Sequence, residues 1–333
     1  MRGEEAAWLN ERQWQWKDIG TQLPSVNDSA ILHFMVTATL KDGRAARWMC
    51  RYNAAARRCT EEHVEVQRGE SADWAELVAL KNRRLESRGK NSLLQQNYSG
   101  SVLSSVLAKV LPPEASELRE MVETLQSFDL LSPQGMRASS RRNSEQHLGA
   151  DGGQIAAYIA AMPEAAKAAL VRQLKTFFPT VVGIGLQKKP GGYYALKVRQ
   201  VSGDRTIETE ARQCSDGLLR VLGILTALNG AASLVCFDEI ENGISFDLTA
   251  AMADELTASD KQILITTHDM LLVNCLPQAS VRLVVKKDGV TRVVPFNRIP
   301  ELMKKAEIFN AGDALLSMTL EDISAAALKA VLS

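Results

Sequence analysis

SLVCFDE, the stretch from Ser233 to Glu239, is an apolar run that ends in two adjacent acids. A short continuous apolar run is typical of a strand buried on both faces of a parallel sheet. Ligands bind at the carboxyl ends of strands in such sheets, so we expect both acids at that edge. Asp238 could hold Mg²⁺ there through water, and Glu239 could polarise an attacking water. Acids after a strand can equally be structural, so the stretch alone leaves both interpretations open.

Downstream, the stretch QILITTHD from Gln262 to Asp269 predicts a second buried strand, over residues 262–266. His268, just beyond its end, could reach a γ-phosphate and sense its presence. A single histidine is more often a satisfied surface or core residue, so this stretch is also ambiguous by itself.

Upstream, QCSDG from Gln213 to Gly217 precedes the apolar run LLRVLGILTAL, which predicts a helix. Ser215 suits the N-cap, Gly217 allows a ligand to approach the backbone, and free N–H groups at a helix start bind anions. An ordinary capped helix would have the same pattern. Arg220 on this helix could meet phosphate or the acids, or it could form a structural ion pair.

Around these stretches, helices and apolar strands alternate, which predicts a parallel sheet covered by helices. The expected elements are helix 217–228, strand 234–237, helix 248–258, strand 262–266, helix 270–275 and strand 281–286. An Ala/Leu-rich helical tail is expected from Met303 onward.

The first hundred residues predict an antiparallel meander, because strands 31–40 and 45–52 flank an Asp42-Gly43 turn and a third strand covers 63–67. Helices are expected at 101–111, 115–128, 155–161 and 164–177, and strands at 181–186 and 193–200. Residues 131–149 are rich in Ser, Arg, Gln and Asn and predict a mobile linker. Its Arg137, Arg141 and Arg142 could contact phosphates or belong to a solvated loop.

Composition narrows the class of protein. The 333 residues are 46% hydrophobic and have a net charge of zero. This balance argues against a protein that coats nucleic acid over its whole surface, but it does not exclude a local basic groove. The sequence has no apolar run of the roughly 20 residues that span a bilayer, and its start has no secretion signal, so a cytoplasmic protein is expected. The five cysteines are scattered without a CxxC pair, which predicts reduced thiols and neither a disulfide set nor a zinc site.

Taken in order, these motifs resemble the ABC-type head of AAA-family ATPases of the SMC, RecF and OLD kind. The stretches QCSDGLLRVLGIL, LVCFDEIENGISFD and ILITTHDMLL match the family's signature, Walker B with D-loop, and switch-histidine motifs. The run LGADGGQIAAYIAAMPE, from Leu148, resembles the family's segment before the signature helix. The resemblance covers residues 148–287 well and the first half in outline. Ile240 departs from a frequent Pro, and Ser245-Phe246 from a frequent His-Pro.

The resemblance implies a role for each matching residue. Asp238 would be the Walker B acid near Mg²⁺, and Glu239 the general base that orients water. Ser215, Asp216 and Gly217 would contact the γ-phosphate of ATP held by a partner subunit. Glu241, Asn242 and Gly243 would form the D-loop at the dimer interface, with Asn242 near the nucleotide, and His268 would be the switch histidine.

The fold that the resemblance implies is α/β and P-loop NTPase-like, with a parallel sheet core, an antiparallel β-meander lobe and a helical insert. The expected domains are a β lobe at 1–100, a helical insert at 101–178, a catalytic core at 179–290 and a helical tail at 291–333.

One motif of the family is missing from the sequence. A P-loop has the pattern GxxxxGK[ST] between a strand and a helix, whereas the only Gly-Lys pair, Gly89-Lys90, precedes Asn91 and predicts a turn. We therefore expect a chain shortened at its N-terminus, by an upstream start or by decay of the gene. Loss of the strand beside the Walker B strand would open the sheet in its middle.

The resemblance implies binding and hydrolysis of MgATP as half of a dimerising head, in DNA maintenance or phage defence. The expected partner is a second copy or a complete ATPase subunit, and the output would act on DNA or on an effector nuclease. The alternative is an inactive remnant, a pseudo-ATPase that binds a partner. A nuclease domain within the chain is not expected. About 45 residues follow the last predicted strand, which is fewer than a typical domain contains.

Overall fold

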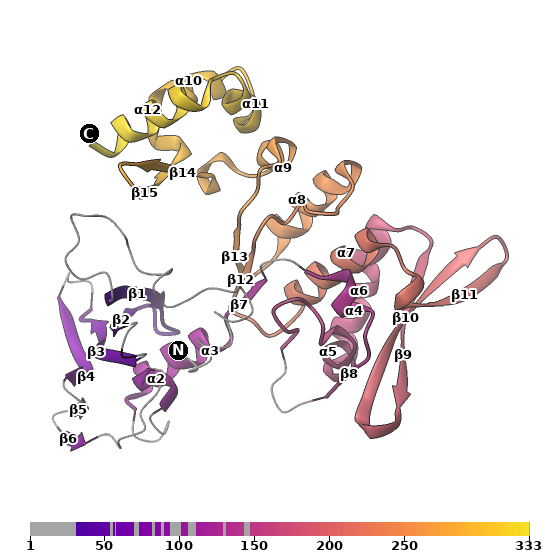
Figure 1. The fold of residues 1–333 in the computed structure, drawn as a ribbon, viewed down its shortest axis with the longest axis horizontal. Helices are drawn as coiled ribbons and strands as arrows, with labels where there is room; N and C mark the ends of the chain where they lie inside the picture. Colours follow the sequence, from indigo (N-terminus) through magenta and orange to yellow (C-terminus); the bar gives the residue numbers. More distant parts are fainter. Residues whose placement is uncertain are drawn as a thin grey trace. The chain divides into compact units, whose positions relative to one another are not determined.

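The computed structural model describes residues 31–53, 56, 58–69, 73–81, 84–87, 90–93, 101–105, 111–128, 131–142 and 147–332. The chain divides into two compact units, Met1–Glu123 and Thr124–Ser333. The division falls inside the segment predicted as a helical insert. Figure 1 labels the elements of each unit.

The first unit is built on an antiparallel six-stranded meander in chain order. Its strands are β1 (Ile31–Thr39), β2 (Ala45–Asn53), β3 (Arg58–Gln67), β4 (Trp74–Lys81), β5 (Arg84–Ser87) and β6 (Lys90–Leu93). Alternate residues of β2 and β3 are buried, as expected of strands with one face on a core. Helices α2 (Val102–Ser105) and α3 (Pro113–Glu123) follow, and α3 contacts β2 and β3.

The turn predicted at Gly89 lies outside the described residues. The strands on either side of it, β5 and β6, are antiparallel partners with Ser87 opposite Lys90. A strand therefore follows Lys90, whereas a helix follows the lysine of a P-loop.

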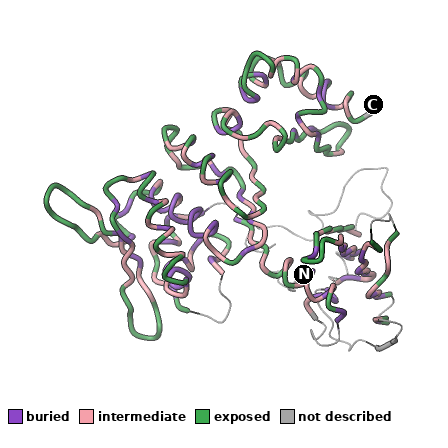
Figure 2. Tube along the Cα trace, turned by 180° about the vertical axis from the view of Figure 1, so that it is seen from behind, coloured by how far each residue is buried: buried purple, intermediate pink, exposed green. Residues whose placement is uncertain are grey.

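The second unit contains a parallel sheet in the order β13-β12-β7. Its strands are β7 (Gln126–Phe128), β12 (Leu234–Phe237) and β13 (Gln262–Ile265). Five helices accompany this sheet, α5 (Ile155–Ala161), α6 (Glu164–Phe177), α7 (Asp216–Leu228), α8 (Thr249–Ala258) and α9 (Met270–Cys275). Helix α7 is buried around almost its whole circumference, and Figure 2 shows the buried residues gathered along it and its neighbours. A helix that is apolar on nearly every face is stable where a core covers it.

A second, antiparallel sheet of this unit is centred on β10 (Tyr193–Ser202). It pairs with β8 (Ser140–Arg141), β9 (Val181–Lys189) and β11 (Arg205–Glu210). Among the described residues, no helix is both long and apolar enough to cross a bilayer.

The structure corrects four expectations about these elements. Helix 115–128 was expected to be continuous, but α3 ends at Glu123 and Gln126–Phe128 pair with β12 as a strand. The described residues of the segment 131–149, namely 131–142 and 147–149, are not a solvated linker, since Leu131, Met136 and Leu148 are buried in the core around the short helix α4 (Pro133–Met136). Ser132 caps α4 by accepting a hydrogen bond from the Gly135 N–H at 3.2 Å.

The third correction concerns strand 281–286, which does not extend the parallel sheet. It forms β14 (Arg282–Lys287), an antiparallel hairpin with β15 (Val290–Pro295) through Asp288-Gly289, both of which have positive φ. An Asp-Gly pair with two positive φ angles is the preferred chemistry of a two-residue hairpin turn. This hairpin packs with α10 (Pro300–Ala306), α11 (Ala311–Leu316) and α12 (Leu320–Leu332) around the buried ring of Phe296.

The fourth correction concerns the expected gap beside the Walker B strand. β12 is hydrogen-bonded on both sides, to β7 and to β13. Among the described strands, β13 and β7 are the outer ones of this sheet, and Leu264 of β13 is exposed.

Candidate functional site

Two acids stand at the end of the central strand of the parallel sheet. Asp238 and Glu239 follow β12 directly, and both are exposed. The parallel register sets Phe237 opposite Ile265, so Thr266 at the end of β13 lies beside the acids. Its hydroxyl donates a hydrogen bond to Asp238 Oδ1 and accepts one from the Glu239 N–H at 2.9 Å. One threonine thus fixes both acids relative to the sheet.

Glu239 has a constrained backbone. Its φ is 45°, in the left-handed region that a residue with a Cβ adopts at a cost of about 1 kcal/mol or more. Asn242 holds this turn, since its Nδ2 donates to Glu239 Oε2 at 2.6 Å and its backbone N–H donates to the Glu239 carbonyl at 3.0 Å. The carboxylate of Glu239 is therefore aimed by a neighbour three residues away.

The segment predicted to hold the switch histidine meets the predicted D-loop through the backbone. The His268 N–H donates to Glu241 Oε1 at 2.7 Å, and the His268 side chain is exposed. The other oxygen, Oε2, is buried and has no hydrogen-bond partner among the described residues. The link between Glu241 and this segment therefore does not use the imidazole, which stays available to a ligand.

The start of α7 is exposed, and side chains cap it. Ser215 accepts a hydrogen bond from the Leu218 N–H at 3.4 Å, as the N-cap prediction requires. Arg137 Nη2 donates to Asp216 Oδ1 at 2.6 Å and to the Cys214 carbonyl at 2.9 Å. Arg137 therefore positions the helix start, whereas Arg141 and Arg142 are exposed. Within the part of the chain that the structure describes, no hydrogen bond joins Ser215 or Asp216 to the acid pair.

Two glycines let the loop after β12 pack against α7. A Cβ on Gly217 would lie 3.3 Å from the Gly243 carbonyl oxygen, and one on Gly243, at φ +70°, would lie 2.6 Å from Arg220 Nε. Arg220 Nε is buried without a hydrogen-bond partner among the described residues, and no ion pair of Arg220 is found there. The loop and the helix therefore form one packed unit beside the acids.

Arg220 shares a small cavity with Asp238, Glu239 and Asn242. Its volume is about 20 Å³. That volume holds about one water, whereas a site for a small-molecule ligand measures roughly 300–1,000 Å³. A ligand of nucleotide size would therefore lie outside this cavity, on the exposed side of the acids.

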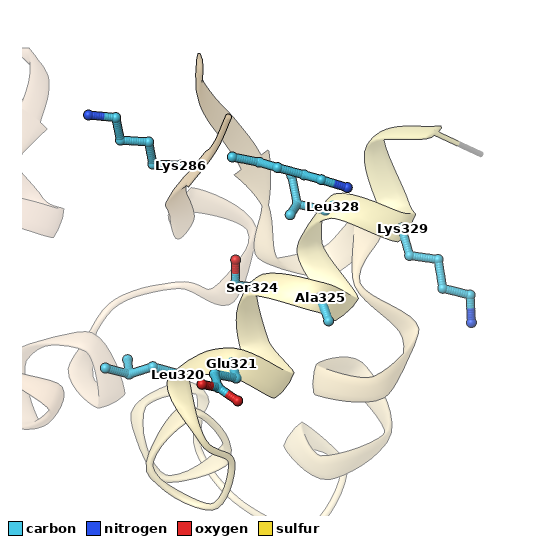
Figure 3. Close-up of a pocket in the computed structure, with 8 residues that line it drawn as sticks. Lys286, Leu320, Glu321, Ser324, Ala325, Leu328 and Lys329 are labelled. Atoms are coloured by element: carbon cyan, nitrogen blue, oxygen red, sulfur yellow. The ribbon is translucent and has the colours of Figure 1, made fainter. Parts of the chain in front are cut away.

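A larger hollow of about 890 Å³ lies between β14 and α12 and shares no residue with the acid pair. Figure 3 shows that Lys286 and Lys329 in its wall point away from each other. Their charges do not converge on one ligand, so the acid pair remains the candidate site.

The acid pair suits a hard divalent cation. The Thr266 hydroxyl donates a hydrogen bond to Oδ1 of Asp238, whereas no described residue donates one to Oδ2 of the same carboxylate. Carboxylate oxygens are the protein ligands that Mg²⁺ prefers. Asp238 would hold the ion, and the adjacent Glu239 would face the water around it. The sequence interpretation named both acids but missed Thr266, whose position after an apolar strand was the available signal.

Comparison with known proteins places these features in a family. The family model "AAA domain, putative AbiEii toxin, Type IV TA system" matches residues 81–274, more than half of the chain. No curated protein matches the sequence.

Solved structures with a similar fold include SMC heads. A structure of an SMC head bound to the C-winged helix domain of ScpA is 11% identical, with a TM-score of 0.50, and covers 84% of this chain and 78% of that chain. The SMC head domain from Thermotoga maritima is 14% identical, with a TM-score of 0.36, and covers 71% and 74% of the two chains. At these identities the likeness concerns the fold alone, and the first of them confirms the predicted α/β fold with a parallel core sheet.

Proposed function

The chain belongs to this family of AAA domains, which confirms the predicted resemblance to AAA-family ATPases, and from that premise we propose that it binds and hydrolyses MgATP as half of a dimerising head. The observation that carries the proposal is the acid pair, Asp238 and Glu239, fixed at the end of β12 by Thr266 and Asn242. Mg²⁺ on Asp238 would neutralise charge on the phosphates. Glu239 would orient the attacking water and accept its proton.

Dimerisation is supported by the start of α7. Ser215 and Asp216 are exposed at the start of α7, which can meet an anion, and no hydrogen bond among the described residues joins them to the acid pair of their own chain. We propose that they contact the γ-phosphate of a nucleotide held by a second copy or by a complete ATPase subunit. His268, exposed beside the acids, would sense the same phosphate.

The proposed setting is DNA maintenance or phage defence, with DNA or an effector nuclease as the target of the ATP cycle. The alternative is a partner-binding module without turnover. One observation favours it, namely that the sequence contains no GxxxxGK[ST] motif to hold the β- and γ-phosphates.

Turnover and light scattering of the purified chain with MgATP decide between these functions. Because the sequence contains no GxxxxGK[ST] motif, turnover by this chain requires that other residues or a second subunit hold the phosphates. Where that requirement is met, we expect the wild type to hydrolyse ATP and to associate when ATP is present. Ser215→Arg should abolish both, because a long cation at the exposed cap blocks the approach of the second chain. Ser202→Arg, at an exposed serine of β10, is the matched control and should behave as the wild type. An inert wild type would instead favour the partner-binding module.

Thr266→Val tests the link between the two strand ends. The valine has nearly the same shape but gives up the hydrogen bonds to Asp238 and to the Glu239 N–H. We expect kcat for MgATP to fall about 10- to 100-fold, because misplaced acids lose transition-state stabilisation. The control is Thr206→Val on the exposed strand β11. Equal kcat values for the two variants would show that the acids do not depend on Thr266.

A further inference from the structure

Two of the cysteines that the sequence leaves apart meet in the first unit. Cys50 on β2 and Cys59 on β3 have their Sγ atoms 2.9 Å apart, and their exposed fractions are only 3% and 7%. A bulge between Arg51 and Tyr52 causes this meeting, since it places Cys59 opposite Tyr52 while Cys50 stays opposite Glu62. The bulge keeps both thiols on the buried face of the sheet.

A carboxylate joins the two thiols inside this core. Glu62 is 1% exposed, and it accepts hydrogen bonds from Trp48 Nε1 at 2.8 Å and from the Val102 N–H at 2.9 and 3.0 Å. These donors hold the carboxylate toward the cysteines. The two sulfurs and a carboxylate oxygen all lie within 4.8 Å of one another. Within the described part of the chain, this is the one group of three such side chains with converging ligand atoms.

We propose that Cys50, Cys59 and Glu62 form a structural site for a thiophilic divalent ion of the Zn²⁺ class. Ligand atoms about 2.3 Å (sulfur) and about 2.0–2.2 Å (oxygen) from one ion are at most about 4.6 Å apart, close to the spread seen here. The ion replaces the two thiol protons, which leave to solvent, and no electron is transferred. The two sulfurs separate by about 1 Å to reach tetrahedral positions.

The donor set selects the ion. Thiolate sulfur disfavours Mg²⁺ and Ca²⁺, which prefer oxygen, and favours zinc-like ions. The same ion also takes a Glu62 carboxylate oxygen as a ligand, which a disulfide between Cys50 and Cys59 would not. Because Glu62 also binds the Val102 N–H at the start of α2, the ion would connect β2, β3 and that helix. Its expected effect is to stabilise the meander of the first unit.

Cobalt serves as the spectroscopic probe for this site. The full chain is reduced, freed of metal with a chelator and titrated with Co²⁺ without oxygen. We expect a thiolate-to-cobalt absorption band in the near ultraviolet that saturates at one equivalent and disappears when Zn²⁺ is added. Cys50→Ala and Cys59→Ala should lose the band. Cys275→Ala, which removes an exposed cysteine, is the control and should keep it.

A second measurement on the wild type does not depend on the folding of the variants. Zn²⁺ should protect two of the five thiols from a thiol reagent and raise the unfolding temperature. Absence of the cobalt band, or its persistence in both alanine variants, would overturn the proposal. So would a Cys50–Cys59 disulfide, seen as a mass two hydrogens lower, in protein purified without oxidant.

Discussion

Glu239→Gln is expected to stop MgATP turnover while ATP-dependent association continues. Glutamine cannot accept the proton of the attacking water, and loss of a general base costs about 10²- to 10⁴-fold in rate. Its side-chain carbonyl can still accept the hydrogen bond that Asn242 Nδ2 now donates to Glu239 Oε2. The local shape of the turn is therefore preserved, and the loss falls on chemistry rather than on binding.

Steady-state phosphate release and light scattering measure these two effects separately. Asp254→Asn on α8 is the matched control, since it also converts an exposed acid to its amide. The control should retain the wild-type rate. A Glu239→Gln protein that hydrolyses ATP as fast as this control would remove Glu239 from the reaction. Loss of association together with turnover would mean that the glutamate supports the interface instead.

The strand ends and the capped helix α7 were predictable because their signals are local. The apolar runs before Asp238 and Thr266 and the cap at Ser215 each lie within a few residues, and β12, β13 and α7 form where these signals place them. Contacts between distant segments have no such signal. Arg137 meets Asp216 across 79 positions, and Thr266 meets Asp238 across 28. The packing of α4 against α7 determines the first pair, and the register of β12 and β13 determines the second.

Other elements depend on their neighbours for their form. β7 is the three-residue segment Gln126–Phe128, which becomes a strand because β12 offers it a partner. Its own residues alternate too briefly to predict that outcome. The meeting of Cys50 and Cys59 likewise requires the bulge in β2–β3, which spacing alone does not reveal. In β14–β15, by contrast, the Asp288-Gly289 pair was a usable hairpin signal.

Gly312→Ala should destabilise the second unit strongly. Gly312 lies in α11 against α9, where a Cβ would be 2.2 Å from the Met270 carbonyl oxygen and 2.8 Å from Asn274 Oδ1. That Asn274 oxygen accepts hydrogen bonds from the backbone N–H groups of Gly312 and Asp313 at 2.7 and 3.1 Å. The methyl group cannot fit beside a backbone carbonyl without separating the helices and breaking these bonds. We expect a loss of about 2–4 kcal/mol in the free energy of unfolding.

Hydrogen exchange at the amides of α9 and α11 measures this loss directly. Tryptophan fluorescence would miss it, because all five tryptophans lie at or before Trp74, in the first unit. Gly203→Ala is the control, since a Cβ there meets nothing within 4 Å and only the φ of +60° carries a cost of about 1 kcal/mol. Because α9 begins directly after His268 and Asp269, its displacement should also slow MgATP turnover. Equal exchange rates in the two variants would show that α9 and α11 accommodate the added methyl group without the expected loss of stability.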